Sequence, residues 1–338
     1  MQVHQNYSLK KYNTFGIDAR TKYFATFSSS DILEQLLENS KNVSTIIILG
    51  GGSNVLLTKN YDGLILKNEI SGIHFISEDD NFVYIKVGAG EVWHHFVLYC
   101  IKNNLGGVEN LSLIPGNVGA SPMQNIGAYG AEIKDVFFEL DAFHLEEKIV
   151  QKFSANDCEF GYRESVFKKQ YKDQFAILNV TYRLRKNPEF NISYGAIEDE
   201  LKKMNIEELS VKAISDAVIS IRTSKLPDPK IIGNAGSFFK NPVVDNHKLE
   251  ELKILSSEKI PFYKTNEERV KIPAGWLIEQ CGWKGFRKGD AGCYDKQALV
   301  LVNYGHATGK EIYHLSEEIK ISVKEKFGIE LEREVNIL

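Results

Sequence analysis

Apolar and polar positions follow two different periods along this chain, and the mixture predicts a fold built from both strands and helices. Alternating positions or short continuous apolar runs predict strands, at residues 21–27, 45–49, 55–57, 63–67, 82–87, 136–145, 148–153, 175–184, 298–302 and 330–338. The runs between 136 and 184 are expected to pair antiparallel. Apolar residues spaced three or four apart predict helices, over 31–37, 93–101, 196–203, 211–222, 247–255, 274–281 and 308–327.

Two helix boundaries carry specific signals. Ser30 or Asp31 is expected to cap the first helix, because a short oxygen-bearing side chain accepts a hydrogen bond from a free backbone N–H. Thr308 and Glu311 have the spacing of a capping box, and Gly328 suits the left-handed residue that ends a helix.

A glycine-rich segment follows the apolar run at 45–49. Its residues, Gly50-Gly51-Gly52-Ser53-Asn54, can present successive backbone N–H groups to a phosphate or diphosphate. The segment is not a Walker loop, because no Gly-Lys-Ser/Thr follows. It is not the dinucleotide fingerprint either, because the next run is a strand and not a helix. A tight hairpin explains it equally well.

The stretch from Pro115 to Gly130 is long and carries no charged residue. Solvated surface loops of this length normally contain charges. The composition therefore favours backbone that wraps closely around a flat, largely neutral ligand. The alternative is a buried Ω-loop that only packs against the rest of the protein.

The segment from Arg222 to Pro242 is organised around Gly233-Asn234-Ala235-Gly236-Ser237. We expect a glycine-rich turn there, where small residues let the backbone approach a ligand and where two phenylalanines behind Ser237 hold its hydroxyl in place. Lys225, Lys230 and Lys240 would favour an anionic group. The plainer alternative is a surface turn between two domains, with prolines as punctuation.

Two further charged features have both a structural and a functional interpretation. Arg163 carries a planar fork of donors suited to a carboxylate or a developing oxyanion, although most arginines form surface salt bridges. Glu330, Glu332 and Glu334 alternate with apolar residues, so they share one face of the last predicted strand. That face would ordinarily be solvated, but one of its carboxylates could be directed into a site.

Composition narrows the class of protein. The 338 residues are 43% hydrophobic and 25% charged with a net charge of −4, as in a globular protein with no electrostatic case for nucleic-acid binding. No apolar run reaches the length of a membrane span, and the N-terminus lacks a signal-peptide core. The four cysteines are scattered, which predicts reduced thiols in a cytoplasm. Cys281, Cys293 and His306 match no zinc spacing, so no metal site is expected.

Taken together, these stretches resemble the bacterial UDP-N-acetylenolpyruvoylglucosamine reductase family, the flavoenzymes of peptidoglycan precursor synthesis and thus of cell-wall formation. The loop around Tyr194 is similar to the form of the family with an extra tyrosine loop. The matching segments run in order along almost the whole chain and are jointly specific: Tyr12–Gly16, Leu49–Asn54, Pro115–Gly130, Tyr162–Ser165, Ser224–Pro229, Gly233–Pro242, Ala274–Ile278 and Glu334–Val335.

The resemblance implies an α+β fold of three parts. Two parts would bind FAD as in the vanillyl-alcohol-oxidase-like flavoproteins, at residues 1–67 and 68–222. A C-terminal α/β part at 223–329 would bind the nucleotide sugar, and the last strand, 330–338, would return to the flavin side. The family's other cofactor is NADPH. A cytoplasmic monomer with non-covalent flavin is expected.

The resemblance also implies roles for individual residues. Ser237 would donate a proton, while Arg163 and Glu334 would stabilise an enol intermediate. The nucleotide-sugar substrate would be bound by Tyr129, Tyr194, Lys225, Asn241 and Gln297. FAD would be bound by Asn13, Thr14, Gly50, Gly51, Gly52, Ser53, Asn54, Gly116, Ser121, Pro122, Asn125, Gly127, Ala128 and Arg222.

The sequence departs from the family pattern at two places, and two other functions remain as alternatives. Ala120 stands where the family often has a second glycine, and the chain ends four residues after Glu334. One rival is another FAD oxidoreductase of the superfamily, acting on a hydroxy acid or alcohol, which would not need the lysine-bearing phosphate arm. The other rival is a non-catalytic nucleotide-binding module, which would lack a flavin colour and NADPH oxidation.

Overall fold

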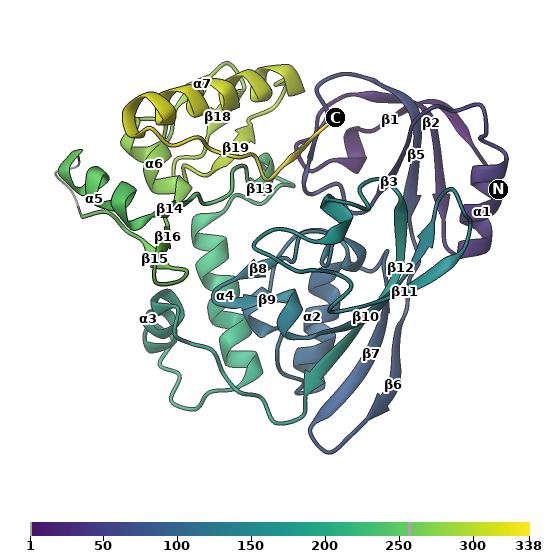
Figure 1. The fold of residues 1–338 in the computed structure, drawn as a ribbon, viewed down its shortest axis with the longest axis horizontal. Coiled ribbons are helices and arrows are strands. Elements are labelled where there is room, and N and C mark those ends of the chain that lie inside the picture. Colours follow the sequence, from purple (N-terminus) through teal and green to yellow (C-terminus); the bar gives the residue numbers. More distant parts are fainter. Residues whose placement is uncertain (1, 256–258) are drawn as a thin grey trace. The chain divides into compact units, whose positions relative to one another are not determined.

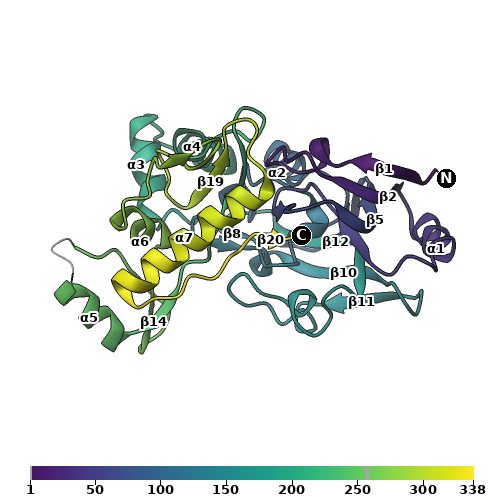
Figure 2. The same cartoon turned by 90° about the horizontal axis from the view of Figure 1, so that it is seen from above.

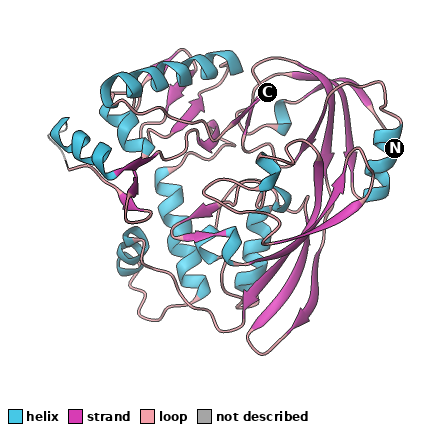
Figure 3. Cartoon of the chain, in the orientation of Figure 1, coloured by secondary structure: helices cyan, strands magenta, loops and turns pink. Residues whose placement is uncertain are grey.

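We describe the protein from a computed structural model, which covers residues 2–255 and 259–338. The chain divides into two compact units that each combine discontinuous segments. The first unit extends from the N-terminus to Tyr7 and includes Thr21–Gly52 and Asp62–Ser224. The second unit contains Ser8–Arg20, Ser53–Tyr61 and Lys225–Leu338. Each unit is described separately below (Figures 1 and 3).

Two main sheets form the framework of the first unit. A four-stranded sheet has the order β1-β2-β5-β3, with the bounds His4–Ser8, Arg20–Phe27, Tyr61–Asn68 and Ile46–Leu49. A five-stranded antiparallel sheet has the order β11-β10-β12-β7-β6, with the bounds Val150–Ser154, Phe137–His144, Phe175–Arg185, Phe82–Gly88 and Ile73–Glu78. The predicted antiparallel pairing between residues 136 and 184 is confirmed. A short hairpin of β8 (Gly127–Ala128) and β9 (Ala131–Glu132) completes the strands of this unit.

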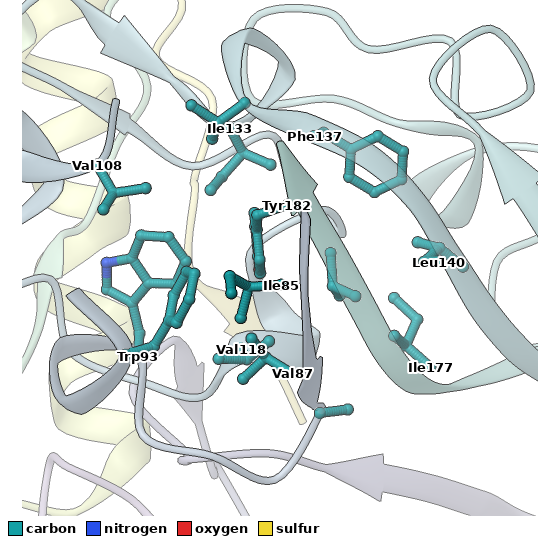
Figure 4. Packing of buried hydrophobic residues seen from close by; sticks show 14 of the residues in the cluster. Ile85, Val87, Trp93, Val108, Val118, Ile133, Phe137, Leu140, Ile177 and Tyr182 are labelled. Atoms are coloured by element: carbon teal, nitrogen blue, oxygen red, sulfur yellow. The ribbon is translucent and has the colours of Figure 1, made fainter. Parts of the chain in front are cut away.

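The core of the first unit lies between helix α2 (Trp93–Lys102) and the five-stranded sheet (Figure 4). Trp93 and Tyr182 are buried there with their ring centroids 5.8 Å apart in an edge-to-face arrangement. The polar atoms of both rings find partners, as buried aromatic residues require. Trp93 Nε1 donates to the Leu111 carbonyl at 2.9 Å, and the Tyr182 hydroxyl lies 2.7 Å from Ser121 Oγ.

Three more helices belong to the first unit: α1 (Ser30–Glu38), α3 (Gly195–Lys203) and α4 (Val211–Lys225). The apolar side of α4 predicted from Val211, Ile214 and Val218 is buried and packs against α3. The capping prediction for α1 is wrong by one residue. Ser29 caps this helix, and its Oγ accepts from Ile32 N at 3.2 Å. A capping side chain must precede the first helical residue, and Ser30 is already helical.

The second unit contains two small antiparallel sheets, a parallel strand pair and three helices. The first sheet, in the order β13-β19-β18-β17, has the bounds Gly233–Ser237, Val300–Asn303, Ala291–Cys293 and Arg287–Lys288. The second sheet, in the order β14-β16-β15, has the bounds Val243–Asp245, Arg269–Lys271 and Tyr263–Lys264. The helices are α5 (Asn246–Leu255), α6 (Ala274–Gln280) and α7 (Gly309–Phe327).

The predicted signals at the start and the end of helix α7 are confirmed. Thr308 Oγ1 accepts from Glu311 N, the Glu311 carboxylate accepts from Thr308 N, and Gly328 ends the helix with a φ of 64°. The strand predicted over 330–338 is shorter than expected. Its regular part is β20 (Asn336–Ile337), which pairs in parallel with β4 (Val55–Leu56).

The glycine-rich turn predicted at 233–237 is wrong, because these residues form strand β13. The strand pairs antiparallel with β19, with an irregularity between Asn234 and Ser237 where Gly236 takes a φ of 68°. The buried strand β19 needs a hydrogen-bonded neighbour for its main chain, and the small residues of β13 supply one. The Asn234 side chain stabilises the irregularity by accepting from Gly236 N at 2.9 Å.

The Tyr182–Ser121 contact gives a stability prediction. In Tyr182→Phe the buried Ser121 hydroxyl loses its partner, and we expect the free energy of unfolding to fall by about 1–3 kcal/mol. Tyr84→Phe is the matched control, because the Tyr84 hydroxyl contacts the exposed Asp79 at 3.0 Å and its loss should cost no more than about 0.5 kcal/mol. Urea unfolding measures both variants, and equal losses would contradict the prediction.

Candidate active site

The residues expected to bind or react lie in both units. In the first unit are Arg163, Tyr129, Tyr194, Gly50, Gly51, Gly52, Gly116, Ser121, Pro122, Asn125, Gly127, Ala128 and Arg222. In the second unit are Asn13, Thr14, Ser53, Asn54, Lys225, Ser237, Asn241, Gln297 and Glu334.

In the first unit the glycines after β3 pack against the uncharged 115–130 loop. A Cβ atom on Gly51 would lie 2.6 Å from Asn117 Oδ1 and 2.9 Å from Gly116 Cα, so no larger residue fits without displacing one of them. Asn117 in turn donates to the Gly90 carbonyl. The glycine segment and the uncharged loop, predicted separately as ligand-binding features, therefore lie in contact.

Hydrogen bonds between the 115–130 loop and the segments around it hold this loop in place. The buried Asn125 amide donates to Gly161 O and to Glu132 Oε2, both at 3.0 Å, and Asn125 Oδ1 accepts from Lys134 N at 3.1 Å. Ser165 Oγ donates to the Met123 carbonyl at 2.6 Å. Neighbouring segments thus supply partners for the polar side chain of Asn125 and for the Met123 carbonyl, as buried polar groups require.

Arg163 contacts the main chain of the same loop. Its Nη2 donates to the Gly127 carbonyl at 2.5 Å, and its Nη1 lies 3.5 Å from the Asn125 carbonyl. Arg163 itself has a φ of 56°, and Asn125 has a φ of 43°. Left-handed backbone at residues other than glycine is costly and is concentrated at functional sites. The structure therefore brings Arg163 to the loop that is expected to hold a flat ligand.

Tyr129, Tyr194 and Arg222 form a second group in the first unit. The rings of Tyr129 and Tyr194 meet edge to face with centroids 5.4 Å apart, and Tyr194 directly precedes α3. Burial raises the pKa of Tyr129, while the neighbouring Arg222 opposes this shift. Burial also lowers the pKa of the Arg222 guanidinium, and its buried Nε has no hydrogen-bond partner in the described part of the chain. A buried guanidinium N–H of this kind fits an anionic or carbonyl oxygen of a ligand.

In the second unit the structure brings the Ser237 strand together with the segment that carries Glu334. Glu334 N donates to the Phe238 carbonyl at 2.9 Å, so the residue after Ser237 is hydrogen-bonded to Glu334. Asn54 Nδ2 donates to the Glu334 carbonyl at 3.3 Å. Ser237 and Glu334 are each partly buried. Three predicted residues from distant parts of the sequence therefore share one neighbourhood.

The Tyr12–Gly16 motif packs against β13 and β19. The Thr14 carbonyl accepts from Asn234 N at 3.0 Å, and the Phe15 carbonyl accepts from Asn303 Nδ2 at 2.9 Å. The Asn13 side chain bonds to the main chain of Leu9 and Ile17, so its amide holds its own loop in shape.

The remaining candidates of the second unit lie near α6 or at the end of α4. Asn241 Oδ1 accepts from Ala274 N at 2.9 Å, at the start of α6. Gln297 Oε1 accepts from Leu299 N at 3.3 Å, and a Cβ atom on Gly275 would lie 2.8 Å from it. Lys225 is the last residue of α4 and is exposed.

The sequence did not reveal two asparagines whose side chains donate to main-chain carbonyls of the candidate site. Asn110 Nδ2 donates to the carbonyls of Tyr129 and Asn191, both at 2.8 Å, and so links the two tyrosine-bearing segments. Asn117 lies within the uncharged stretch that the sequence marks as a ligand-binding loop, but nothing in the sequence indicates its bond to Gly90. Asn110 has no local sequence signal.

In residues 2–255 and 259–338 no cluster of three or more histidine, cysteine, aspartate or glutamate side chains is arranged to hold a metal ion. The four cysteines of the chain are all free thiols, and each of them lies in a described region. No helix within the described ranges is both long and apolar enough to cross a membrane.

Comparison with known proteins places this geometry in a family. Two family models match: the C-terminal domain of UDP-N-acetylenolpyruvoylglucosamine reductase over residues 228–338, and an FAD binding domain over 23–151. The UDP-N-acetylenolpyruvoylglucosamine reductase of Flavobacterium johnsoniae is 53% identical over 342 residues, covering 100% of both chains. The chain belongs to the UDP-N-acetylenolpyruvoylglucosamine reductase family.

Solved structures confirm the fold of this reductase. The UDP-N-acetylenolpyruvylglucosamine reductase of Thermus caldophilus matches with a TM-score of 0.69 at 22% identity, covering 100% of this chain and 99% of that one. A p-cresol methylhydroxylase matches with a TM-score of 0.50 at 9% identity, covering 94% and 82% of the two chains. At these identities the likeness is one of fold, and it bears out the predicted α+β, vanillyl-alcohol-oxidase-like class.

The contact at Gly51 predicts how strongly this reductase depends on its glycine loop. Gly51→Ala places a methyl group against Asn117 and Gly116, so we expect the dissociation constant for FAD to rise about 10-fold or more, a loss of at least about 1.4 kcal/mol in binding free energy. Gly195→Ala is the matched control, because a Cβ atom there meets nothing within 4 Å. Titration of each flavin-free variant with FAD measures both dissociation constants, and a wild-type dissociation constant in Gly51→Ala would refute the steric argument.

Proposed function

We propose that this reductase converts the enolpyruvyl ether of UDP-N-acetylglucosamine to UDP-N-acetylmuramate, with NADPH and FAD, in peptidoglycan precursor synthesis. The observation that carries the proposal is 53% identity, over the whole of both chains, to a reductase named for this substrate. The order of the catalytic motifs along the chain and the contact between the Ser237 strand and Glu334 support it.

FAD fits the residues of the first unit. Gly51 has no room for a side chain beside Gly116 and Asn117, and a run of three glycines suits a diphosphate held by main-chain N–H groups. The uncharged loop through Ser121, Pro122, Asn125, Gly127 and Ala128 suits a flat neutral ring, and Arg222 has a buried N–H to donate. Asn13, Thr14, Ser53 and Asn54 are proposed to complete the cofactor contacts. When bound there, FAD would supply hydride transfer between NADPH and the terminal alkene carbon of the substrate.

The protein must handle the charge and the proton that hydride addition requires. Negative charge develops at the neighbouring carbon and spreads into the substrate carboxylate as an enolate. We assign its stabilisation to Arg163, whose positive charge offsets it, and to Glu334, which would donate a hydrogen bond as the neutral acid, since preorganised polar groups lower the energy of such a state. Ser237 then gives its proton to that carbon. A serine hydroxyl is a weak acid in water, so its surroundings must make it a competent donor.

Substrate binding is assigned to the remaining candidates. Lys225 would pair with the diphosphate, and Tyr194, in contact with Tyr129, would cover it. Asn241 and Gln297 would add uncharged hydrogen bonds. In this proposal residues 1–67 and 68–222 form the two parts that bind FAD, 223–329 bind the nucleotide sugar, and 330–338 return to the flavin side.

The cellular setting follows from the chemistry of the reactants. Nucleotide sugars and NADPH are made in the cytoplasm, and free thiols are stable there, so we place the enzyme in that compartment. We propose that it acts as a monomer without nucleic acid or membrane partners.

The proton-donor role predicts a selective defect. Ser237→Ala should leave flavin reduction by NADPH unchanged but slow reoxidation by substrate by about 10²–10⁴-fold, the usual contribution of a general acid. Ser322→Ala, a partly buried serine on α7, is the control and should leave both steps unchanged. Anaerobic stopped-flow absorbance separates the two half-reactions. Fast reoxidation of Ser237→Ala would remove Ser237 from the role of donor.

A further inference from the structure

The segment that carries Glu334 is anchored by side chains as well as by its main chain. Residues 332–334 run antiparallel to 238–240, with Lys240 N donating to Glu332 O and Glu334 N donating to Phe238 O, both at 2.9 Å. The largely buried Lys240 also pairs with the exposed Glu332 carboxylate at 2.6 Å. Figure 2 shows this segment running alongside α7.

Arg333 provides the contact with α7. Its Nε donates to Ser316 Oγ at 2.9 Å, its Nη2 pairs with the Glu317 carboxylate, and its guanidinium lies 4.5 Å from the ring centroid of Tyr313. Ser316 is fully buried, and the Arg333 side chain is 15% exposed. The hydrogen bond from Arg333 lowers the pKa of Glu317. One guanidinium thus joins three side chains of a single helix.

Because Arg333 is held on α7, the backbone geometry of the segment fixes the direction of the Glu334 side chain. In an extended segment successive side chains point to opposite faces. With Arg333 fixed on α7, the side chains of Glu332 and Glu334 leave the segment on the other face. The Lys240–Glu332 pair lies on that face, so both sides of the segment are held.

We propose that Arg333 is a positioning residue for Glu334, which it orients by holding the terminal segment on α7. The inference rests on the proposed role of Glu334 in stabilising the enolate. Arg333 contributes through geometry, because a planar guanidinium can bond a hydroxyl and a carboxylate while stacking on an aromatic ring. A lysine at this position would keep the charge but lose the fork of donors.

The experiment compares half-reactions of the flavin-loaded, full-length enzyme. Arg333→Met should leave reduction by NADPH within about 2-fold of wild type and slow reoxidation by UDP-N-acetylglucosamine enolpyruvate about 10-fold or more, since misplacing a catalytic group costs up to about 10²-fold. The reoxidation rate of Arg333→Lys should lie between that of Arg333→Met and that of the wild type. If Arg333→Met does not fold, Glu317→Gln, which removes the charged partner on α7 with little change in volume, replaces it.

The matched control is Arg287→Met. Arg287 also lies over a tyrosine ring, at 4.3 Å from the centroid of Tyr304, and also pairs with a carboxylate, Asp290, at 2.9 Å. It belongs to the same unit but anchors the β17–β18 region. Both half-reactions of Arg287→Met should therefore match wild type.

A double-variant cycle separates positioning from general destabilisation. Glu334→Gln should slow reoxidation by about 10²–10³-fold, whereas Glu330→Gln, an exposed glutamate of the same terminal segment that pairs with Lys324 at 3.5 Å, should not. If Arg333 acts through Glu334, Arg333→Met/Glu334→Gln should be no slower than Glu334→Gln alone.

The possible outcomes distinguish the positioning role of Arg333 from the enolate-stabilising role of Glu334. A slow Glu334→Gln with a fast Arg333→Met, or with a double variant in which the two losses multiply, would overturn the inference and leave the role of Glu334 intact. A Glu334→Gln variant that reoxidises at the wild-type rate would overturn the role of Glu334, and the positioning role of Arg333 with it.

Discussion

The position of Glu334 beside the Ser237 strand depends on hydrogen bonds made by the main chain of the last residues. Phe238 accepts from Glu334 N, Asn54 donates to Glu334 O, and β20 adds a parallel pair with β4. These bonds use no part of the Glu334 carboxylate. The path of the backbone therefore places the carboxylate next to the Ser237 strand, and Arg333 and Lys240 secure the same segment through their side chains.

The first unit holds a loop that carries no charged residue of its own. The 115–130 loop is partly buried, and its polar groups bond to Tyr182, Ser165 and Arg163 and, through its own Asn125, to the Gly161 carbonyl. A flat neutral ligand, as proposed for this loop, would meet backbone and amide groups that are already fixed. The left-handed backbone at Arg163 and Asn125 is the local cost of this arrangement.

Local signals and the pairing of strands that follow one another between residues 136 and 184 are predictable from the sequence, whereas pairing between strands far apart in the chain is not. The capping box at Thr308, the stop at Gly328 and the apolar face of α4 were predicted because their signals lie within one or two helical turns. Strand β13 was taken for a turn, because its partner β19 lies more than sixty residues away. Strand β6 was missed because its residues are mostly exposed and show no alternation. Family resemblance supplied the candidate residues, and the contacts of Asn110 and Arg333 required the folded chain.

The central claim is that one flavin passes electrons from NADPH to an enolpyruvyl nucleotide sugar. An anaerobic flavin spectrum in two additions tests it most directly. NADPH should bleach the oxidised spectrum, and UDP-N-acetylglucosamine enolpyruvate should then restore it. Bleaching without recovery would contradict the proposed substrate, and a protein that shows no flavin spectrum even after FAD is added would contradict the account as a whole.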